Sequence, residues 1–482
     1  MVEYTRINEN LQISKVLTGL WQIADMERDG TTLDPHEASK SMIPYVEAGL
    51  TTFDMADHYG SAEIIAGTFK NHQPNGEKAQ LLTKWVPKPG KVTRQEVREA
   101  VQLSLDRMQQ PVIDLIQFHA WYYPDPIWLD CLFWLQELKE EGLIKALGLT
   151  NFDEAHLRMA VQSGVEIATN QVCYSLIDQR AGNQMATTCE ELGVKILAYG
   201  TIAGGFLSDR WLGKPEPTAD LATWSQMKYK RFIDEAGGWS KLQHLLKATN
   251  EVAQKHGVSI ANVASRYMLE QPAVGGVIIG ARLSKSAHVE DTVKLFEFAL
   301  DEEDHQKIRE AQAALIPIHG DCGDEYRKPP YLTASGDLSH HLEKIPKPFF
   351  PIDKKGGGKK VLSGTVWEDM AGYCRAVRVG NRISVSGTTA THGKKMIGGN
   401  DPGAQAHFVI DKIEAAIESL GGSLEHVVRT RIFVNNINDW EPVARAHGWR
   451  FKDIQPANTL VEAKLVGQGY LVEIEAEAEI PD

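Results

Sequence analysis

The chain has 482 residues, of which 43% are hydrophobic and 24% are charged, and its formal net charge is -13. A chain of this length exceeds a single compact core and predicts two or three globular domains. The acidic balance disfavours binders of nucleic acids or membrane surfaces, because both of those partners require a clustered basic face.

Eight short apolar runs occur before residue 300, and helical spacing separates them. The runs cover residues 16–21, 51–54, 81–84, 115–119, 146–149, 167–171, 195–199 and 277–280. The clearest helix spans residues 93–108 and opens with a capping box formed by Thr93 and Glu96. A strand followed by a helix is repeated eight times, and this pattern predicts an α/β fold. We expect residues 1–315 to form a (β/α)8 TIM barrel. The long gap at 201–271 predicts an extra loop and helices over the catalytic end.

The alternation stops after residue 311, and two different regions follow. Residues 316–364 are rich in Pro, Gly, His and Lys and predict a linker, which includes the basic run 354–360. Residues 365–482 predict a smaller α+β domain with a hairpin around the turn Gly380-Asn381. This domain carries more sheet than its one predicted helix can cover. We therefore expect a homo-oligomer in which this domain forms the contacts between copies. The oligomer would be a trimer or a dimer, and we favour the trimer.

Four polar residues stand at or just beyond the ends of the early apolar runs. They are Asp54, Tyr59, Lys84 and His119, and the runs read TTFD, LLTK and LIQFH. Barrel enzymes place their chemistry at the carboxyl ends of the strands, so these four side chains should converge on one mouth. Taken singly, each has an ordinary alternative as a loop cap, a rim aromatic or a solvated side chain.

The four residue types together suit proton transfer to a carbonyl compound. A phenol has a pKa of roughly 10, so Tyr59 can donate a proton near neutral pH only if its pKa moves closer to the working pH. We expect the ammonium of Lys84 to favour the phenolate and lower that pKa, with Asp54 holding Lys84 in place. His119 would bind and orient the substrate carbonyl.

The barrel region resembles the aldo-keto reductase superfamily. The stretch 53–60, FDMADHYG, is similar to the family motif FDTAxxYG, and the later motifs TK at 83–84, QFH at 117–119, LTNF at 149–152 and NQVCYS at 170–175 follow in order. The resemblance implies an oxidoreductase that reduces an aldehyde or ketone reversibly, with Tyr59 as proton donor and hydride from a nicotinamide. It also implies that Thr150, Asn151 and Gln171 hold the carboxamide while Tyr199 stacks on the ring.

The same resemblance places the adenosine end of the cofactor at the segment IIGARLSKSAHVEDT. Gly280 would allow close backbone approach, and Arg282, with Lys285 or Ser286, would bind a 2′-phosphate through charge-assisted hydrogen bonds. We therefore expect NADP(H), with NAD(H) less favoured. Thr292 stands where the family often has an asparagine that holds adenine.

Aromatic residues near the strand ends could form the wall of a substrate pocket. Trp21, Trp85 and Trp121 are placed for this role, with core packing as the competing interpretation. They favour a small-molecule substrate that is apolar or a sugar ring and that carries a carbonyl.

The carboxyl-terminal region resembles the Rid/YjgF family of reactive-intermediate deaminases. The similarity rests on SVSG at 384–387, QPA at 455–457 and VEIEA at 472–476. Deaminating members carry an arginine directly after the Pro-Ala pair, where this chain has Asn458, while Glu475 stands where the family places a water-activating carboxylate. Asparagine lacks the charge that clamps a substrate carboxylate. We therefore expect an oligomerisation or ligand-binding module rather than a deaminase.

Five scattered cysteines define neither a disulfide framework nor a metal site: Cys131, Cys173, Cys189, Cys322 and Cys374. The amino terminus, MVEYTRINEN, has no targeting pattern, and we expect a cytoplasmic protein with no membrane or nucleic-acid partner. Two alternatives to a simple reductase stay open. One is a nucleotide-sensing regulatory subunit without significant turnover, and the other is a bifunctional reductase and imine deaminase.

Overall fold

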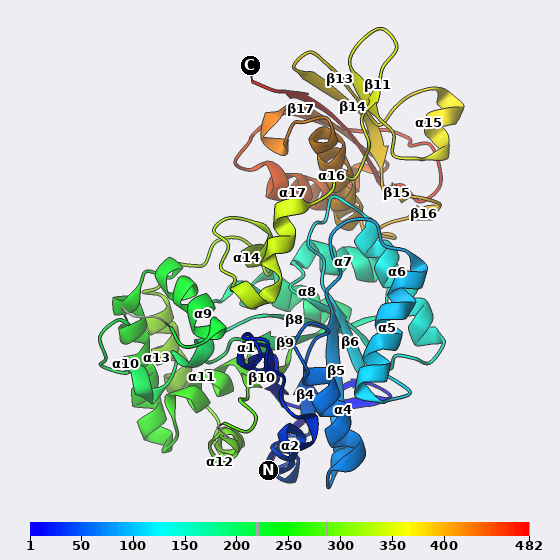
Figure 1. Cartoon of the computed structure of the whole chain (residues 1–482). Coiled ribbons are helices and arrows are strands. Elements are labelled where there is room, and N and C mark those ends of the chain that lie inside the picture. Colours follow the sequence, from blue (N-terminus) through cyan, green and yellow to red (C-terminus); the bar gives the residue numbers. More distant parts are fainter. Residues whose placement is uncertain (218–220, 286–287, 482) are drawn as a thin grey trace.

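The structure is a computed structural model that describes residues 1–217, 221–285 and 288–481. Its amino-terminal part is a closed barrel of parallel strands in the order β10-β3-β4-β5-β6-β7-β8-β9 (Figure 1). These strands are β3 (Val16–Gly19), β4 (Thr52–Asp54), β5 (Gln80–Trp85), β6 (Leu115–Phe118), β7 (Leu147–Thr150), β8 (Ile167–Cys173), β9 (Lys195–Tyr199) and β10 (Val274–Gly280). The predicted (β/α)8 barrel is confirmed.

Helices surround the barrel. They are α1 (Trp21–Met26), α2 (Pro35–Lys40), α3 (Ile43–Glu47), α4 (Ala62–His72), α5 (Arg94–Met108), α6 (Ile127–Glu140), α7 (Glu154–Gln162), α8 (Gln184–Leu192), α9 (Trp224–Glu235), α10 (Trp239–His256), α11 (Ile260–Leu269), α12 (Val289–Val293) and α13 (Glu302–Gln312). The predicted capping box is present at α5, where Thr93 and Glu96 each accept a backbone hydrogen bond from the other. No helix among the described residues is long and apolar enough to cross a membrane.

An antiparallel hairpin of β1 (Tyr4–Asn8) and β2 (Leu11–Ser14) packs into the amino end of the barrel. Its buried residues join the apolar side chains that fill the barrel interior: Leu11, Ile13, Leu17, Leu82, Leu115, Ala146, Leu197 and Ile278. A filled interior leaves the carboxyl ends of the strands as the place where polar side chains can meet a ligand.

The region predicted to be a linker is folded over its first half. It contains the short helix α14 (Asp324–Arg327), and Tyr326 is only 6% exposed. Arg327 donates to the carbonyl oxygens of Ala120 and Asn151, which binds this segment to the barrel mouth. The second half forms the hairpin of β11 (Ile352–Asp353) and β12 (Lys359–Val361), with the glycines of the basic run exposed at its turn. The boundaries 1–315, 316–364 and 365–482 stay a prediction.

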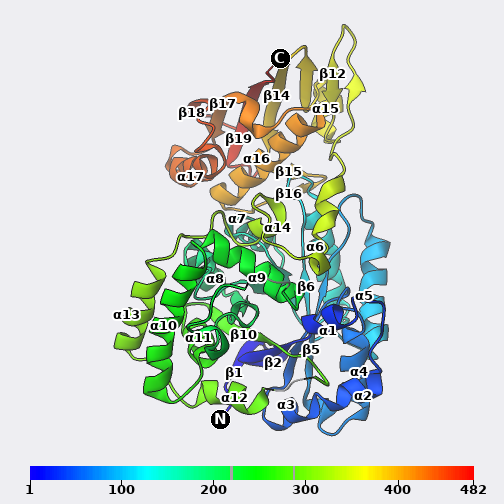
Figure 2. The same ribbon diagram turned by 60° about the vertical axis from the view of Figure 1, so that its left-hand side comes forward.

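The carboxyl-terminal part is an α+β domain around a seven-stranded sheet in the order β11-β12-β13-β14-β19-β17-β18. Its further elements are α15 (Val366–Ala371), β13 (Ala376–Val379), β14 (Arg382–Thr389), β15 (Thr391–His392), β16 (Lys395–Met396), α16 (Pro402–Ser419), β17 (Val427–Val434), α17 (Trp440–Phe451), β18 (Ala457–Glu462) and β19 (Val472–Glu479). The predicted turn Gly380-Asn381 joins β13 to β14. Helices α16 and α17 pack together beside the sheet (Figure 2), and the sequence had predicted only the first of them.

The two domains meet where α16 packs against α7. His156 on α7 lies between two carboxylates, with Nδ1 2.6 Å from Asp153 and Nε2 2.9 Å from Asp411 of α16. Arg450 of α17 donates to Asp411 and to Glu414. Burial lowers the pKa of His156, but the two carboxylates of Asp153 and Asp411 raise it by more. The resulting pKa of His156 is about 9. A protonated histidine therefore joins the domains.

Alkaline pH should weaken this junction. A histidine whose folded pKa of about 9 exceeds its usual 6.5 contributes stability that is complete below the lower value and is lost as the pH rises through the higher one. Melting temperatures measured between pH 6 and pH 10 should fall for the wild-type protein. The difference between wild type and His156→Gln should shrink over the same range, and a constant difference would contradict the assignment.

Candidate active site

The four predicted catalytic residues line one cavity at the carboxyl end of the barrel. The cavity has a volume of about 680 Å³. Asp54 ends β4, Tyr59 lies on the loop that follows it, Lys84 lies near the end of β5 and His119 follows β6. The barrel topology thus brings together side chains that are up to 65 positions apart in the chain.

Asp54 and Lys84 form a buried ion pair at the base of the cavity. Lys84 Nζ donates to Asp54 Oδ2 at 2.6 Å and to the Met55 carbonyl at 2.9 Å, and both side chains are at most 5% exposed. Asp54 Oδ1 accepts from the amides of Gln171 at 2.7 Å and Gln117 at 3.1 Å. Gln117 was not predicted, although a glutamine inside the apolar run LIQFH was a signal that its side chain needs a buried partner.

Tyr59 is held beside this pair with its phenol protonated. Lys84 Nζ lies 4.9 Å from the centre of the Tyr59 ring, and Trp21 packs edge-on against the ring. The pKa of Tyr59 is raised well above its usual value, first by burial and then by the charge of Asp54. The expected lowering of this pKa is therefore wrong for this structure, because burial and the nearby carboxylates raise it.

His119 presents a ring nitrogen to the cavity. Its Nδ1 lies 3.3 Å from the Thr150 carbonyl, and its buried Nε2 has no hydrogen-bond partner among the residues that the structure describes. Burial, followed by the charge of Arg327, lowers the pKa of His119 well below its usual value. The ring is neutral at physiological pH, and because its Nδ1 donates to the Thr150 carbonyl, Nε2 carries a lone pair that can accept from a hydroxyl of a ligand.

The residues predicted to hold a nicotinamide also line the cavity, and each of them already has a hydrogen-bond partner in the protein. Asn151 has a left-handed backbone (φ 58°), and its Oδ1 accepts from the Tyr199 hydroxyl at 2.8 Å. Thr150 Oγ1 donates to the Gln171 carbonyl. Both amide hydrogens of Gln171 point to Asp54 and Gln117, so its Nε2 holds the catalytic carboxylate and only its Oε1 is left for a ligand.

The predicted adenosine end lies at the other end of the same cavity. Arg282 lines it, and its buried Nε has no partner within the described parts of the chain. A Cβ atom added at Gly280 would meet only Gln22 Cγ, at 3.9 Å, so protein packing leaves space there. Ser286 lies outside the described residues. An unpaired guanidinium nitrogen and an open backbone fit a phosphate-bearing group.

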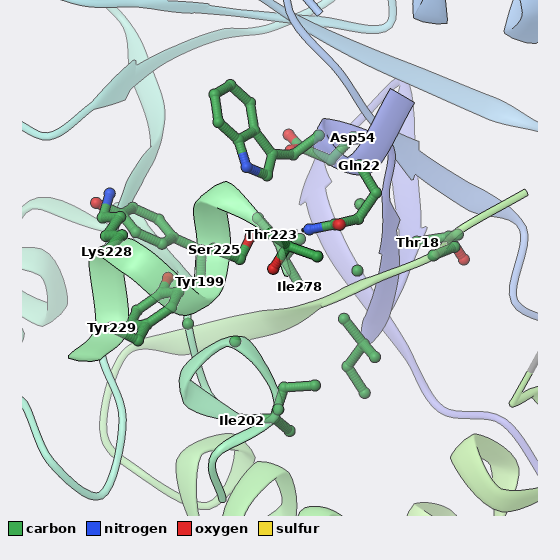
Figure 3. Close-up of a pocket in the computed structure, with 18 of the residues that line it drawn as sticks. Thr18, Gln22, Asp54, Tyr199, Ile202, Thr223, Ser225, Lys228, Tyr229 and Ile278 are labelled. Atoms are coloured by element: carbon green, nitrogen blue, oxygen red, sulfur yellow. Dashed lines mark hydrogen bonds between the residues drawn. The ribbon is translucent and has the colours of Figure 1, made fainter. Parts of the chain in front are cut away.

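The aromatic wall is partly as predicted. Trp21 and Trp121 line the cavity, whereas Trp85 packs against Phe118 in the barrel core, so core packing was the right interpretation for Trp85. Trp224 of α9, from the long gap between β9 and β10, was not predicted and completes the wall. Figure 3 shows Lys228 of the same helix beside Tyr199.

Polar residues from beyond the barrel enter the site as well, and none of them was predicted. Glu325 pairs with Arg180 at 2.9 Å, and its Oε1 lies 3.1 Å from the Tyr199 hydroxyl, whose one hydrogen is shared between Glu325 and the closer Asn151. Tyr326 and Asp337 line the cavity. The Pro and Gly content of this region predicted a linker, and composition alone does not show which single side chains of a loop pack into a site.

The two candidates in the second domain point away from each other. Asn458 on β18 pairs in register with Thr430 and donates to its hydroxyl at 2.9 Å, while Glu475 on β19 pairs with Arg431 and accepts from it at 2.9 Å. Thr430 and Arg431 are neighbours on β17, so their partners lie on opposite faces of the sheet. Within one chain, Asn458 and Glu475 do not form a common site.

Residues 15–313 match the model of the Aldo/keto reductase family. The chain belongs to this family. Residues 367–480 match the Endoribonuclease L-PSP family model, so the predicted two-part resemblance is confirmed. As a member, the protein is an oxidoreductase that depends on a nicotinamide cofactor and acts on carbonyl compounds.

The barrel has named relatives along most of its length. Aldo-keto reductase YhdN of Bacillus subtilis is 25% identical over 347 residues, which cover 68% of this chain and 98% of the relative. The NADH-specific methylglyoxal reductase of Escherichia coli is 24% identical over 330 residues, covering 64% of this chain and 97% of the relative. The structure of glycerol dehydrogenase AKR11B4 from Gluconobacter oxydans superimposes with a TM-score of 0.56 at 24% identity, covering 66% of this chain and 97% of that one, and shows the same fold.

Proposed function

We propose that the barrel reduces an aldehyde or ketone to an alcohol, reversibly, with NADPH as the hydride donor and Tyr59 as the proton donor. The observation that carries this proposal is that Tyr59 and His119 line one cavity together with the buried Lys84–Asp54 pair. The bound nicotinamide supplies the hydride to the carbonyl carbon.

The residues of the chain account for the proton. As negative charge develops on the substrate oxygen, that oxygen becomes a stronger base than a phenolate, so it takes the proton of Tyr59 even though burial raises the pKa of the phenol. The hydroxyl of the product can then donate to Nε2 of His119, because Nδ1 of that ring donates to the Thr150 carbonyl. The phenolate that remains faces the Lys84 ammonium, 4.9 Å from the ring centre. Because Asp54 and Met55 hold Lys84 in place, this charge needs no rearrangement during the reaction.

We assign NADPH rather than NADH from Arg282, whose buried and unpaired Nε would meet the 2′-phosphate. A relative named as NADH-specific shows that this choice varies among similar proteins. Lys285, the other cation considered for this phosphate, is exposed, whereas Arg282 lines the cavity.

We infer that the second domain assembles the protein into a trimer and does not deaminate imines. Its two candidate residues lie on opposite faces of the sheet, which removes the support for a deaminase site within one chain. The edge strand β18 is largely exposed: Val461 on the strand is 43% exposed, and Val466, just beyond its end, is 75% exposed. An exposed strand edge with apolar side chains favours burial against another copy.

Replacing Tyr59 with Phe should abolish reduction and preserve cofactor binding. The hydroxyl is the proton source, and loss of a general acid typically costs about 100- to 10,000-fold in rate. Oxidation of NADPH with a panel of aldehydes would measure the rate, and fluorescence titration would measure binding. Tyr331→Phe, at an exposed position, is the matched control. Wild-type protein that binds NADPH but turns over no carbonyl compound would instead support the regulatory alternative.

Replacing Arg282 with Ala should weaken NADPH binding about 10- to 100-fold and change NADH binding much less, because a charge-assisted hydrogen bond to the 2′-phosphate is lost. Dissociation constants for both cofactors would be compared with those of Arg98→Ala, an exposed arginine on α5 that pairs with Glu141. Equal weakening for NADPH and NADH would contradict the role of Arg282.

The protein in solution should form an assembly whose mass is about three times that of one chain. Burial of the exposed β18 edge against a second copy is the physical reason. Sedimentation velocity at micromolar concentration would measure the mass. A monomer would contradict the assembly proposal, and a dimer would contradict the trimer.

A further inference from the structure

The roof of the active-site cavity comes from a segment that lies outside both family matches. Those matches end at residue 313 and resume at residue 367, whereas Tyr326, Ala334 and Asp337 line the cavity together with Tyr59. The backbone at Gly336 packs closely against two tryptophans of the cavity wall. A Cβ atom added there would lie 2.2 Å from Trp224 and 2.9 Å from Trp21, so a larger residue would not fit without a shift.

Three polar side chains at this roof form a connected group. Lys228 Nζ donates to the Tyr326 hydroxyl and lies 3.9 Å from Asp337 Oδ2. Asp337 Oδ2 also accepts from the Ala334 amide at 3.0 Å. Its other oxygen, Oδ1, is buried and accepts no hydrogen bond from any residue that the structure describes. A buried carboxylate oxygen without a donor is costly, and a ligand hydroxyl would satisfy it.

This group adjoins the reacting atoms. The Tyr326 ring packs edge-on against His119, with 5.6 Å between the ring centres, and its hydroxyl lies 3.5 Å from that of Tyr199. Tyr326 accepts its hydrogen bond from Lys228, so its own proton is available to a second oxygen. A substrate hydroxyl can accept from Tyr326 and donate to Asp337 Oδ1 while the substrate carbonyl accepts from the Tyr59 hydroxyl.

The charges around this position favour a neutral ligand. Lys228 is offset by Asp337 at 3.9 Å, and the carboxylate of Glu325 lies next to Tyr199. A substrate carboxylate would face these two anions, whereas a substrate ammonium would face Lys228. A hydroxyl can both accept from Tyr326 and donate to Asp337, and it brings no net charge into the buried site.

We propose that Lys228, Tyr326 and Asp337 form a hydroxyl-binding subsite that selects neutral hydroxyaldehydes or hydroxyketones. This inference rests on the proposed reductase function and names its substrate class. The subsite is supplied by the segment between the domains, so substrate choice and the connection between the two domains depend on the same stretch of chain.

Three probe aldehydes test the subsite. Glyceraldehyde carries hydroxyls on a three-carbon chain, propanal has the same chain without them, and glyoxylate carries a carboxylate. Wild-type protein with NADPH should show the highest kcat/KM for glyceraldehyde. Asp337→Asn should lower kcat/KM for glyceraldehyde about 10- to 100-fold and that for propanal by less than about threefold, because only the former uses the charged acceptor.

A second subsite variant and a control variant complete the test of the subsite. Tyr326→Phe retains the ring and should reduce the preference for glyceraldehyde in the same direction, while Asp353→Asn, on the exposed β11–β12 hairpin, should leave the preference unchanged. Equal kcat/KM for glyceraldehyde and propanal, or a preference for glyoxylate, would overturn the subsite while the reductase function stands. Inactivity toward all three aldehydes would overturn the reductase proposal itself.

Discussion

The buried ion pair between Lys84 and Asp54 is the interaction on which the rest of the active site depends. Two charges that are at most 5% exposed persist only if every remaining polar atom is satisfied, and removing one partner of such a pair typically costs about 3–5 kcal/mol. Gln117 and Gln171 complete the set from β6 and β8. The pair thus ties separate strands of the barrel together and places the ammonium near the Tyr59 ring.

The same loops that build the site also join the two domains. Asn151 lies in the cavity, and two residues later Asp153 caps α7 and pairs with His156, which contacts Asp411 of the second domain. Arg327 holds the roof segment to the carbonyl of Asn151. The stretch from Asn151 to His156 thus contacts both the active-site cavity and the second domain.

The features that were predicted correctly are those encoded in short windows of sequence. The strands of the barrel, the capping box at Thr93 and the two-residue turn at Gly380 each depend on neighbouring residues. The convergence of Asp54, Tyr59, Lys84 and His119 followed from one topological rule, because parallel strands of a barrel end at the same mouth. The cofactor roles came only from the family resemblance.

The sequence by itself determined the barrel, the second domain and the four polar residues that meet at the barrel mouth, because the alternation of apolar and polar residues follows strand and helix geometry. Only the tertiary structure decided the remaining features. The raised pKa of Tyr59 depends on burial and on a carboxylate from the neighbouring environment, and the engagement of Gln171 depends on a partner 117 positions away. The roof residues Tyr326 and Asp337 are more than 200 positions from the catalytic set. Contacts between residues so far apart in the sequence arise from tertiary packing, and no short sequence pattern predicts them.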